Sequence, residues 1–170
     1  MSLAALAQLR LDAVWWLVSP QNPLKPAAGM APAADRLASA RRVAAHPRIV
    51  ATAIEAGLGT RYTADTLAAL RRRFPRTRFV WLMGADNLLQ MPRWRDWPAI
   101  FAATPVAVFN RRPYALGALS GVAARRFAGF RLRADAAGRL AAADPPAWVF
   151  LPTPVHPASS TALRARGGRA

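Results

Sequence analysis

Hydrophobic and polar positions along the chain follow two patterns, short apolar runs and longer segments with helical spacing. The runs are rich in Val, Ile, Phe and Trp, which is typical of strands buried on both faces of a parallel sheet. We expect strands at residues 13–18, 48–53, 79–83, 106–109 and 148–151. We expect helices at residues 33–45, 63–74, 94–103 and 116–127. This alternation predicts an α/β doubly wound fold, in which ligands bind beyond the carboxyl ends of the strands.

The segment 63–74 has the clearest helical pattern. Leu67, Leu70 and Phe74 fall on one helical face. Thr63 is placed to cap the start, and Pro75 prevents the helix from continuing. The arginines at 71–73 would then lie at the negative end of the helix dipole, which favours cations.

Two segments lack a regular pattern. Residues 19–32 contain four prolines, so they can form neither a regular helix nor a central strand. Because this loop follows a predicted strand, it is either a ligand-contacting element or a simple connector. Residues 131–146 are rich in Ala and end in Asp-Pro-Pro, which indicates a connector without a site.

Length and composition predict one domain that spans residues 1–170, with a core supported by 54% hydrophobic residues. No window approaches the roughly 18 consecutive apolar residues of a membrane span, and the start lacks a signal-peptide pattern. We therefore expect a soluble protein without a membrane partner. The absence of cysteine excludes disulfides and thiolate metal sites and is consistent with a cytoplasmic location, which we expect.

The formal charge of +16 comes from 24 basic against 8 acidic residues, and Lys25 is the only lysine. A charge of this size favours nucleic-acid binding when the cations are clustered. Here the arginines are scattered through an Ala-rich chain, as GC-rich coding produces. We expect nucleic acid not to be the main partner, and a basic nucleic-acid-binding module stays as an alternative.

Five short segments place polar or aromatic residues beside predicted strand or helix ends. They are Asp-Ala-Val-Trp-Trp-Leu-Val-Ser-Pro-Gln-Asn-Pro-Leu-Lys at 12–25, Tyr-Thr-Ala-Asp-Thr-Leu at 62–67, Met-Gly-Ala-Asp-Asn-Leu at 83–88 followed by Met-Pro-Arg-Trp-Arg-Asp-Trp at 91–97, Phe-Asn-Arg-Arg-Pro at 109–113 and Ser-Ser-Thr-Ala-Leu-Arg at 159–164. In order and spacing, over nearly the whole chain, they resemble the bacterial nicotinate-nucleotide adenylyltransferases. The resemblance implies a Rossmann-like nucleotidyltransferase sheet and an ATP-using enzyme of NAD synthesis.

Two of the segments are candidates for contact with the nicotinate nucleotide. Lys25 is a compact, flexible cation that suits a mononucleotide phosphate, or else it is a solvated loop lysine. Thr63 is first of all a candidate N-cap, and the resemblance also places Tyr62 and Thr63 against this substrate.

The third segment, residues 83–88 followed by 91–97, is the one most specific to this family. Gly84 would let a nucleotide approach the backbone, and Asp86 would accept hydrogen bonds from ribose hydroxyls, with a helix cap as its structural alternative. Trp94 would stack on the pyridine ring while a neighbouring cation such as Arg95 offsets the ring's carboxylate. Trp97 is expected to pack in the core.

The last two segments are candidate phosphate sites. We expect a short helix to open at Ser159, Ser160 and Thr161, whose free amides and hydroxyls, with the Arg164 guanidinium, suit the β and γ phosphates of ATP. An ordinary serine-capped helix is the alternative. Arg111 and Arg112, at the end of a predicted strand, are either phosphate contacts or solvated charges.

The chain departs from the family at one place. Members begin with a strand and a loop of the form Gly-x-Phe-Asp/Asn-Pro-x-His-x-Gly-His, which holds the ATP phosphates. The printed sequence has no such loop, and the surroundings of His46 and His156 do not match it. We expect a domain incomplete at its N-terminus, with a start assigned too late as the explanation. We also expect two strands with unpaired backbone groups, a hydrophobic slot between them, and adenylyl transfer slowed by orders of magnitude.

The resemblance implies transfer of the adenylyl group of ATP to nicotinate mononucleotide, giving nicotinate adenine dinucleotide and pyrophosphate. We assign no catalytic side chain, because the expected His-x-Gly-His loop is missing from the printed sequence. The other candidate residues would bind and position the substrates, and none is expected to act as a general base. Mg²⁺ is expected as a cofactor held mainly through substrate phosphates. The alternative within the superfamily is a nucleotidyltransferase acting on pantetheine phosphate or on the amidated nicotinamide nucleotide.

Overall fold

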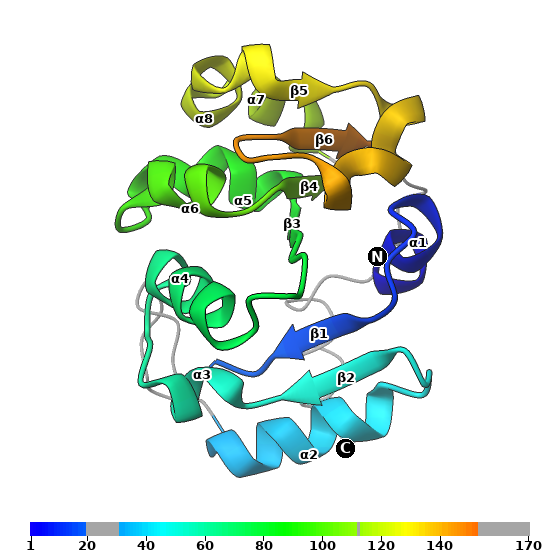
Figure 1. Cartoon of the computed structure of the whole chain (residues 1–170), viewed down its shortest axis with the longest axis vertical. Helices are drawn as coiled ribbons and strands as arrows, with labels where there is room; N and C mark the ends of the chain where they lie inside the picture. The colour runs from blue at the N-terminus through cyan, green and yellow to red at the C-terminus, as the bar shows by residue number, and fades with distance from the viewer. Residues whose placement is uncertain (20–30, 112, 153–170) are drawn as a thin grey trace.

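The computed structural model describes residues 1–19, 31–111 and 113–152 (Figure 1). The strands formed by these residues are β1 (Val14–Leu17), β2 (Ile49–Thr52), β3 (Trp81–Gly84), β4 (Val106–Phe109), β5 (Arg131–Leu132) and β6 (Trp148–Leu151). The α-helices are α1 (Ser2–Gln8), α2 (Ala33–Val43), α3 (Ile54–Leu58), α4 (Thr63–Arg73), α5 (Ala85–Gln90), α6 (Trp97–Ala103), α7 (Ala115–Ser120) and α8 (Val122–Arg126). The 3₁₀ helices are η1 (Met91–Arg93), η2 (Ala128–Phe130) and η3 (Ala134–Ala142).

Four strands form a parallel sheet in the order β3-β4-β6-β5. Along β4, side chains alternate between two core clusters: Val106 and Val108 belong to one, and Ala107 and Phe109 to the other. All residues of β4 and β6 are buried, as expected for inner strands that are covered on both faces.

Helices cover both faces of this sheet, which confirms the predicted doubly wound architecture (Figure 1). One core cluster takes side chains from α5, α6, α7 and α8, and the other takes them from α1 and η3. The buried indole of Trp148 in β6 donates a hydrogen bond of 2.8 Å to the carbonyl of Phe127, which connects the sheet to the end of α8. The carboxyl ends of β3 and β4 are therefore held by a well-packed core.

Strands β1 and β2 form a separate two-stranded parallel sheet, paired from Val14 with Ile49 to Leu17 with Thr52. Helix α2 packs against β2, and α1 packs against β1. Helix α4 packs against α6, and Leu67 of α4 joins the core cluster of the larger sheet. The two sheets are thus joined through α1 and α4.

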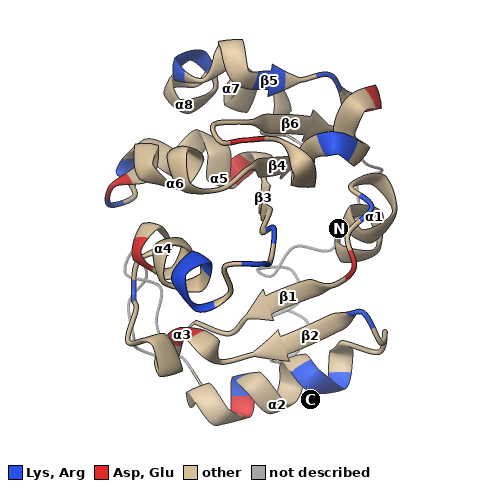
Figure 2. Ribbon diagram, viewed as in Figure 1, with Lys and Arg blue, Asp and Glu red and all other residues tan. Residues whose placement is uncertain are grey.

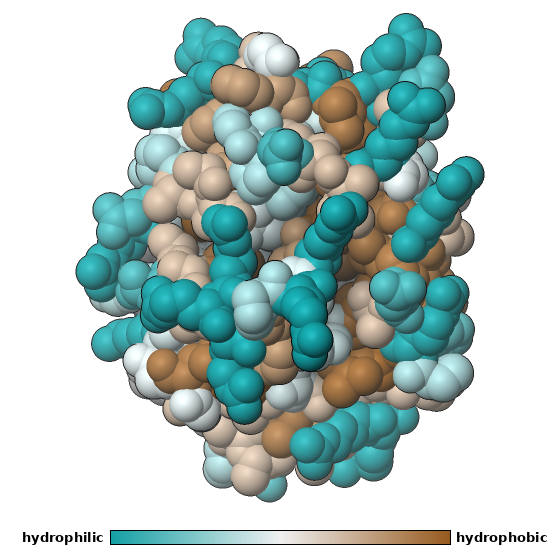
Figure 3. Space-filling view, in the orientation of Figure 1, coloured by the Kyte–Doolittle hydropathy of each residue, from teal (hydrophilic) through white to brown (hydrophobic). Residues whose placement is uncertain are grey.

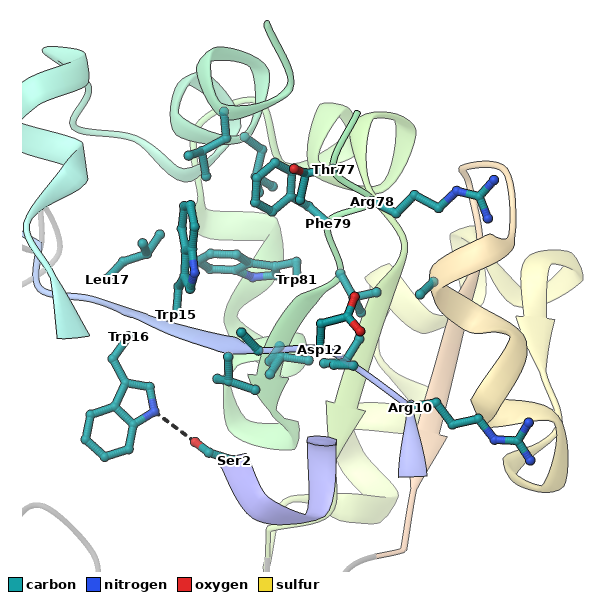
Figure 4. Close-up of a pocket in the computed structure, with 18 of the residues that line it drawn as sticks. Ser2, Arg10, Asp12, Trp15, Trp16, Leu17, Thr77, Arg78, Phe79 and Trp81 are labelled. Carbon is teal, nitrogen blue, oxygen red and sulfur yellow. Dashed lines mark hydrogen bonds between the residues drawn. The ribbon is translucent and has the colours of Figure 1, made fainter. Parts of the chain in front are cut away.

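A cavity of about 830 Å³ separates β1 from β3 (Figure 4). Among the described residues, β1 pairs only with β2 and β3 only with β4, so each has one edge without a partner strand. Trp15 and Trp81 enter the cavity from the two strands, and Trp15 meets Phe74 and Phe79 edge to face. The predicted hydrophobic slot between two incompletely paired strands is confirmed. In the space-filling view, apolar residues are visible between hydrophilic residues on the face turned toward the viewer (Figure 3).

Three sequence-based expectations about elements are wrong. Residues 131–146 are not a bland connector, because they form β5 and η3, whose Leu140 is fully buried. The helix expected at 116–127 is divided at Gly121 into α7 and α8, since the extended backbone there interrupts the helix. The helix expected from residue 94 begins at Trp97, because Asp96 adopts φ +48° and is its N-cap.

Basic residues are distributed along the chain, among other places in α2, α4, α8 and β5 (Figure 2). The arginines at 71–73 occupy the last turn of α4, as predicted. Within the described part of the chain, no helix is long and apolar enough to cross a membrane.

Candidate functional site

Tyr62 and Thr63 lie at the start of α4, where the chain turns from an extended residue into the helix. Tyr62, with φ −107° and ψ 143°, is the N-cap, and its carbonyl accepts the N–H of Thr66 at 2.9 Å. Thr63 is the first helical residue, and no side-chain cap hydrogen bond is formed. The prediction that Thr63 caps the helix is therefore wrong, because the extended residue before it occupies that position.

Trp94 and Arg95 follow the 3₁₀ helix η1. Trp94 is extended and partly buried, and it packs against the main core cluster. The Arg95 guanidinium lies over the Tyr62 ring at 4.6 Å from its centroid, and it forms long ion pairs with Asp65 at 3.7 Å and Asp96 at 3.5 Å. These contacts join the segment after η1 to the start of α4. Trp97 packs against the core, as predicted, with its ring edge-on to Phe127.

A cavity of about 510 Å³ is bounded by these two segments. It brings together four of the predicted site residues, Tyr62, Thr63, Trp94 and Arg95. The remaining lining residues are Leu17, Ser19, Glu55, Arg61, Trp81 and Arg93.

The lining of this cavity suits a planar, negatively charged ligand. Tyr62 and Trp94 offer aromatic faces on which a ring can stack. Arg61 and Arg93 form no hydrogen bond or ion pair with other residues in the described ranges, so both cations are available to a carboxylate or phosphate.

Gly84, Asp86 and Arg111 form a second group, at the carboxyl ends of β3 and β4. Arg111 donates from Nη1 to Oδ2 of Asp86 at 3.0 Å. Asp86 lies in the first turn of α5, whose N-cap is Gly84, so its carboxylate is not the cap. A Cβ at Gly84 would overlap Oδ1 of Asp86, so this position accepts only glycine without a shift of the carboxylate. Sequence reasoning predicted all three residues, and the structure places them together.

Two buried acceptors at this sheet edge have no partner among the described residues, Oδ1 of Asp86 and Oδ1 of Asn110. Because Gly84 pairs with Phe109, the residues that follow the two strands are neighbours. Unpaired buried acceptors are rare and favour a ligand with hydroxyl donors. Asn110 was missed as a site residue, since its unpaired oxygen is visible only in the structure.

Several predicted site residues lie outside the described residues: Lys25, Arg112, Ser159, Ser160, Thr161 and Arg164, together with His156. His46 is described and lies in the turn before β2, where its Nδ1 accepts the N–H of Arg48 at 3.2 Å. No group of three His, Cys, Asp or Glu side chains suited to a metal occurs in the ranges that the structure covers.

An aromatic cavity with arginines in its lining, and unpaired acceptors at the carboxyl ends of parallel strands, are features typical of nucleotide-binding proteins of the α/β class. Comparison with known proteins agrees: the cytidylyltransferase-like family model matches residues 1–166. A relative from Cereibacter sphaeroides named "Probable nicotinate-nucleotide adenylyltransferase" is 58% identical, over 98% of this chain and 88% of its own length. Relatives of the same name from a Bradyrhizobium species and from Parvibaculum lavamentivorans are each 53% identical, over 96% of this chain and 85% and 81% of their own lengths.

The chain belongs to the cytidylyltransferase-like family of nucleotidyltransferases and, within it, to the nicotinate-nucleotide adenylyltransferases.

Proposed function

We propose that this chain transfers the adenylyl group of ATP to nicotinate mononucleotide, forming nicotinate adenine dinucleotide and pyrophosphate. The relatives' shared name supports this reaction. The observation that carries the proposal is the cavity that brings Tyr62, Thr63, Trp94 and Arg95 together. A nicotinate ring would stack on Trp94, and its carboxylate would lie near the arginines and the free amides at the start of α4.

The second group of residues would hold ATP. The paired carboxylate of Asp86 and the amide oxygen of Asn110 would accept hydrogen bonds from the ribose hydroxyls. Ser159, Ser160, Thr161 and Arg164 are proposed for the β and γ phosphates, and Lys25, Arg111 and Arg112 for phosphate contacts. With both nucleotides fixed, the phosphate oxygen of nicotinate mononucleotide attacks the α phosphorus in line. The bond from this phosphorus to the pyrophosphate oxygen breaks, and no covalent enzyme intermediate forms.

Magnesium is proposed as the cofactor. Because Mg²⁺ keeps most of its waters and prefers phosphate oxygens, the phosphates of the substrates would supply most of its other ligands. The ion would neutralise charge on the pyrophosphate leaving group. A cytoplasmic location stays a prediction from the lack of cysteine, and the dispersed arginines support small nucleotides over nucleic acid as partners.

The test is product formation with each substrate omitted in turn. The purified chain is incubated with ATP, Mg²⁺ and nicotinate mononucleotide, and nicotinate adenine dinucleotide is measured by chromatography and mass spectrometry. We expect product formation that requires both nucleotides. Failure of the chain to bind nicotinate mononucleotide in a calorimetric titration would contradict the proposal.

A further inference from the structure

Glu55 is the one charged side chain that is buried among the described residues, with 7% of its surface exposed. It lies in the short helix α3 and lines the cavity that contains Trp94. Its Oε1 is 3.1 Å from the hydroxyl of Thr66, and its Oε2 has no hydrogen-bond partner among the residues that the structure describes. Burial of a half-paired carboxylate destabilises the fold, so its contribution to packing alone does not explain a glutamate here.

Residues 60–66 form one wall of the cavity, and the hydrogen bonds of Glu55 connect it to both ends of this segment, Thr60 and Thr66. The hydroxyl of Thr66, in the first turn of α4, is also 2.9 Å from that of Thr60. Since each hydroxyl carries one proton, the consistent arrangement has Thr60 donating to Thr66 and Thr66 donating to Glu55. The backbone N–H of Thr60 also donates to the carbonyl of Glu55 at 3.1 Å.

Between these two threonines lie Arg61, Tyr62 and Thr63, all of which line the cavity. The N–H of Thr66 donates to the Tyr62 carbonyl at 2.9 Å, so movement of Thr66 would displace the N-cap. Because no side-chain cap fixes the start of α4, this chain of hydrogen bonds restrains the wall from its buried side, and the contacts of Arg95 with Tyr62 and Asp65 restrain it from the exposed side.

We propose that Glu55 is a positioning residue for the pyridine nucleotide, which acts through Thr66 and Thr60 to fix Tyr62 and Thr63 at the cavity wall. This inference rests on the proposed function and assigns a role to a residue outside the predicted site. Glu55 does not take part in the chemistry. Its effect is confined to the geometry of the wall, so it acts on the binding of nicotinate mononucleotide and not on that of ATP.

Binding of nicotinate mononucleotide and of ATP is measured by calorimetry on the full chain and its variants. Glu55→Ala and Thr66→Val should each weaken nicotinate mononucleotide binding about fivefold to tenfold, the loss of one buried hydrogen bond. Glu55→Gln keeps an acceptor for Thr66 and should stay within about twofold of the original affinity. Thr104→Val is the matched control, because Thr104 is as buried as Thr66, its hydroxyl has no partner within the described ranges, and it does not line the cavity.

Amide hydrogen exchange of residues 60–66, without ligand, separates this inference from the proposed function. Faster exchange in Glu55→Ala and Thr66→Val, but not in Glu55→Gln or Thr104→Val, supports the positioning role even if the chain fails to bind nicotinate mononucleotide. Unchanged exchange and unchanged affinity in Thr66→Val would overturn the inference. Equal losses in Glu55→Gln and Glu55→Ala would also overturn it, because they would indicate a role for the charge and not for the hydrogen bond.

Discussion

Replacement of Gly84 by alanine tests whether the carboxylate of Asp86 is held in place for a ligand. The added Cβ would overlap Oδ1 of Asp86, whereas Cδ of Arg111, at 3.7 Å, is at an ordinary contact distance. The Asp86 side chain must therefore turn, which breaks its 3.0 Å pair with Arg111. The backbone has room to stay as it is, so we expect the change to alter the site more than the fold.

The expected loss of stability in Gly84→Ala is small, whereas the expected loss of ATP affinity is large. An off-rotamer side chain costs about 0.5–1.5 kcal/mol, and a half-exposed ion pair contributes about 0–1 kcal/mol. Together they lower the free energy of unfolding by about 0.5–2.5 kcal/mol, which corresponds to a fall of about 1–10 °C in Tm. A displaced carboxylate loses a charge-assisted hydrogen bond to the ribose, so the affinity for ATP should fall about tenfold or more.

Thermal unfolding by circular dichroism and ATP binding by calorimetry give the two quantities. Gly129→Ala is the matched control, since a Cβ there meets nothing within 4 Å. In Gly84→Ala combined with Asp86→Ala the clash is absent, so the double variant should recover the part of the Tm lost to the clash, but neither the part lost with the ion pair nor the ATP affinity. The reasoning is refuted if Gly84→Ala and Gly129→Ala match in both Tm and ATP affinity.

Four further outcomes are expected. Trp94→Ala should weaken nicotinate mononucleotide binding about tenfold or more, whereas Trp94→Phe keeps a stacking face; an unchanged KM for the alanine variant counts against stacking. Asp86→Ala should impair ATP use while the far-ultraviolet spectrum stays native, and loss of the fold would indicate a structural role instead. Nicotinamide mononucleotide should bind more weakly than the acid, and equal affinity would contradict the role of the arginines. The hydrogen bond from Arg133 holds the pKa of Asp135 below its usual range, so any stabilisation over Asp135→Asn should be present at neutral pH and decrease as the pH falls below the usual pKa, as urea midpoints at about pH 7 and about pH 3 would show.

Much of the fold could be predicted because its strands are continuous apolar runs. The runs at 106–109 and 148–151 coincide with β4 and β6, and the helical face at 63–74 coincides with α4 to within one residue. Helices α3 and α5 were not predicted, since each is one or two turns long and too short for a hydrophobic period. Residues 131–146 contain little hydrophobic bulk, and their 3₁₀ helix is stabilised by burial of Leu140 against the sheet, which is a tertiary effect.

The candidate site, too, could be predicted only in part from the sequence. Tyr62, Thr63, Trp94 and Arg95 were identified from short motifs, and the structure brings them to one cavity. Glu55 was missed because nothing in its local sequence distinguishes it from an ordinary glutamate. Asn110 lies in one of the short motifs, but no role was assigned to it there. Their significance comes from burial without a full set of partners, which depends on side chains far away in the sequence.

A crystal structure of the chain with nicotinate mononucleotide tests most directly whether the cavity beside Trp94 holds the pyridine ring. We predict the ring stacked on the Trp94 indole, with its carboxylate among the arginines and its phosphate directed toward the carboxyl ends of β3 and β4. A nucleotide bound in the slot between β1 and β3, or with its ring away from Trp94 and Tyr62, would contradict this assignment.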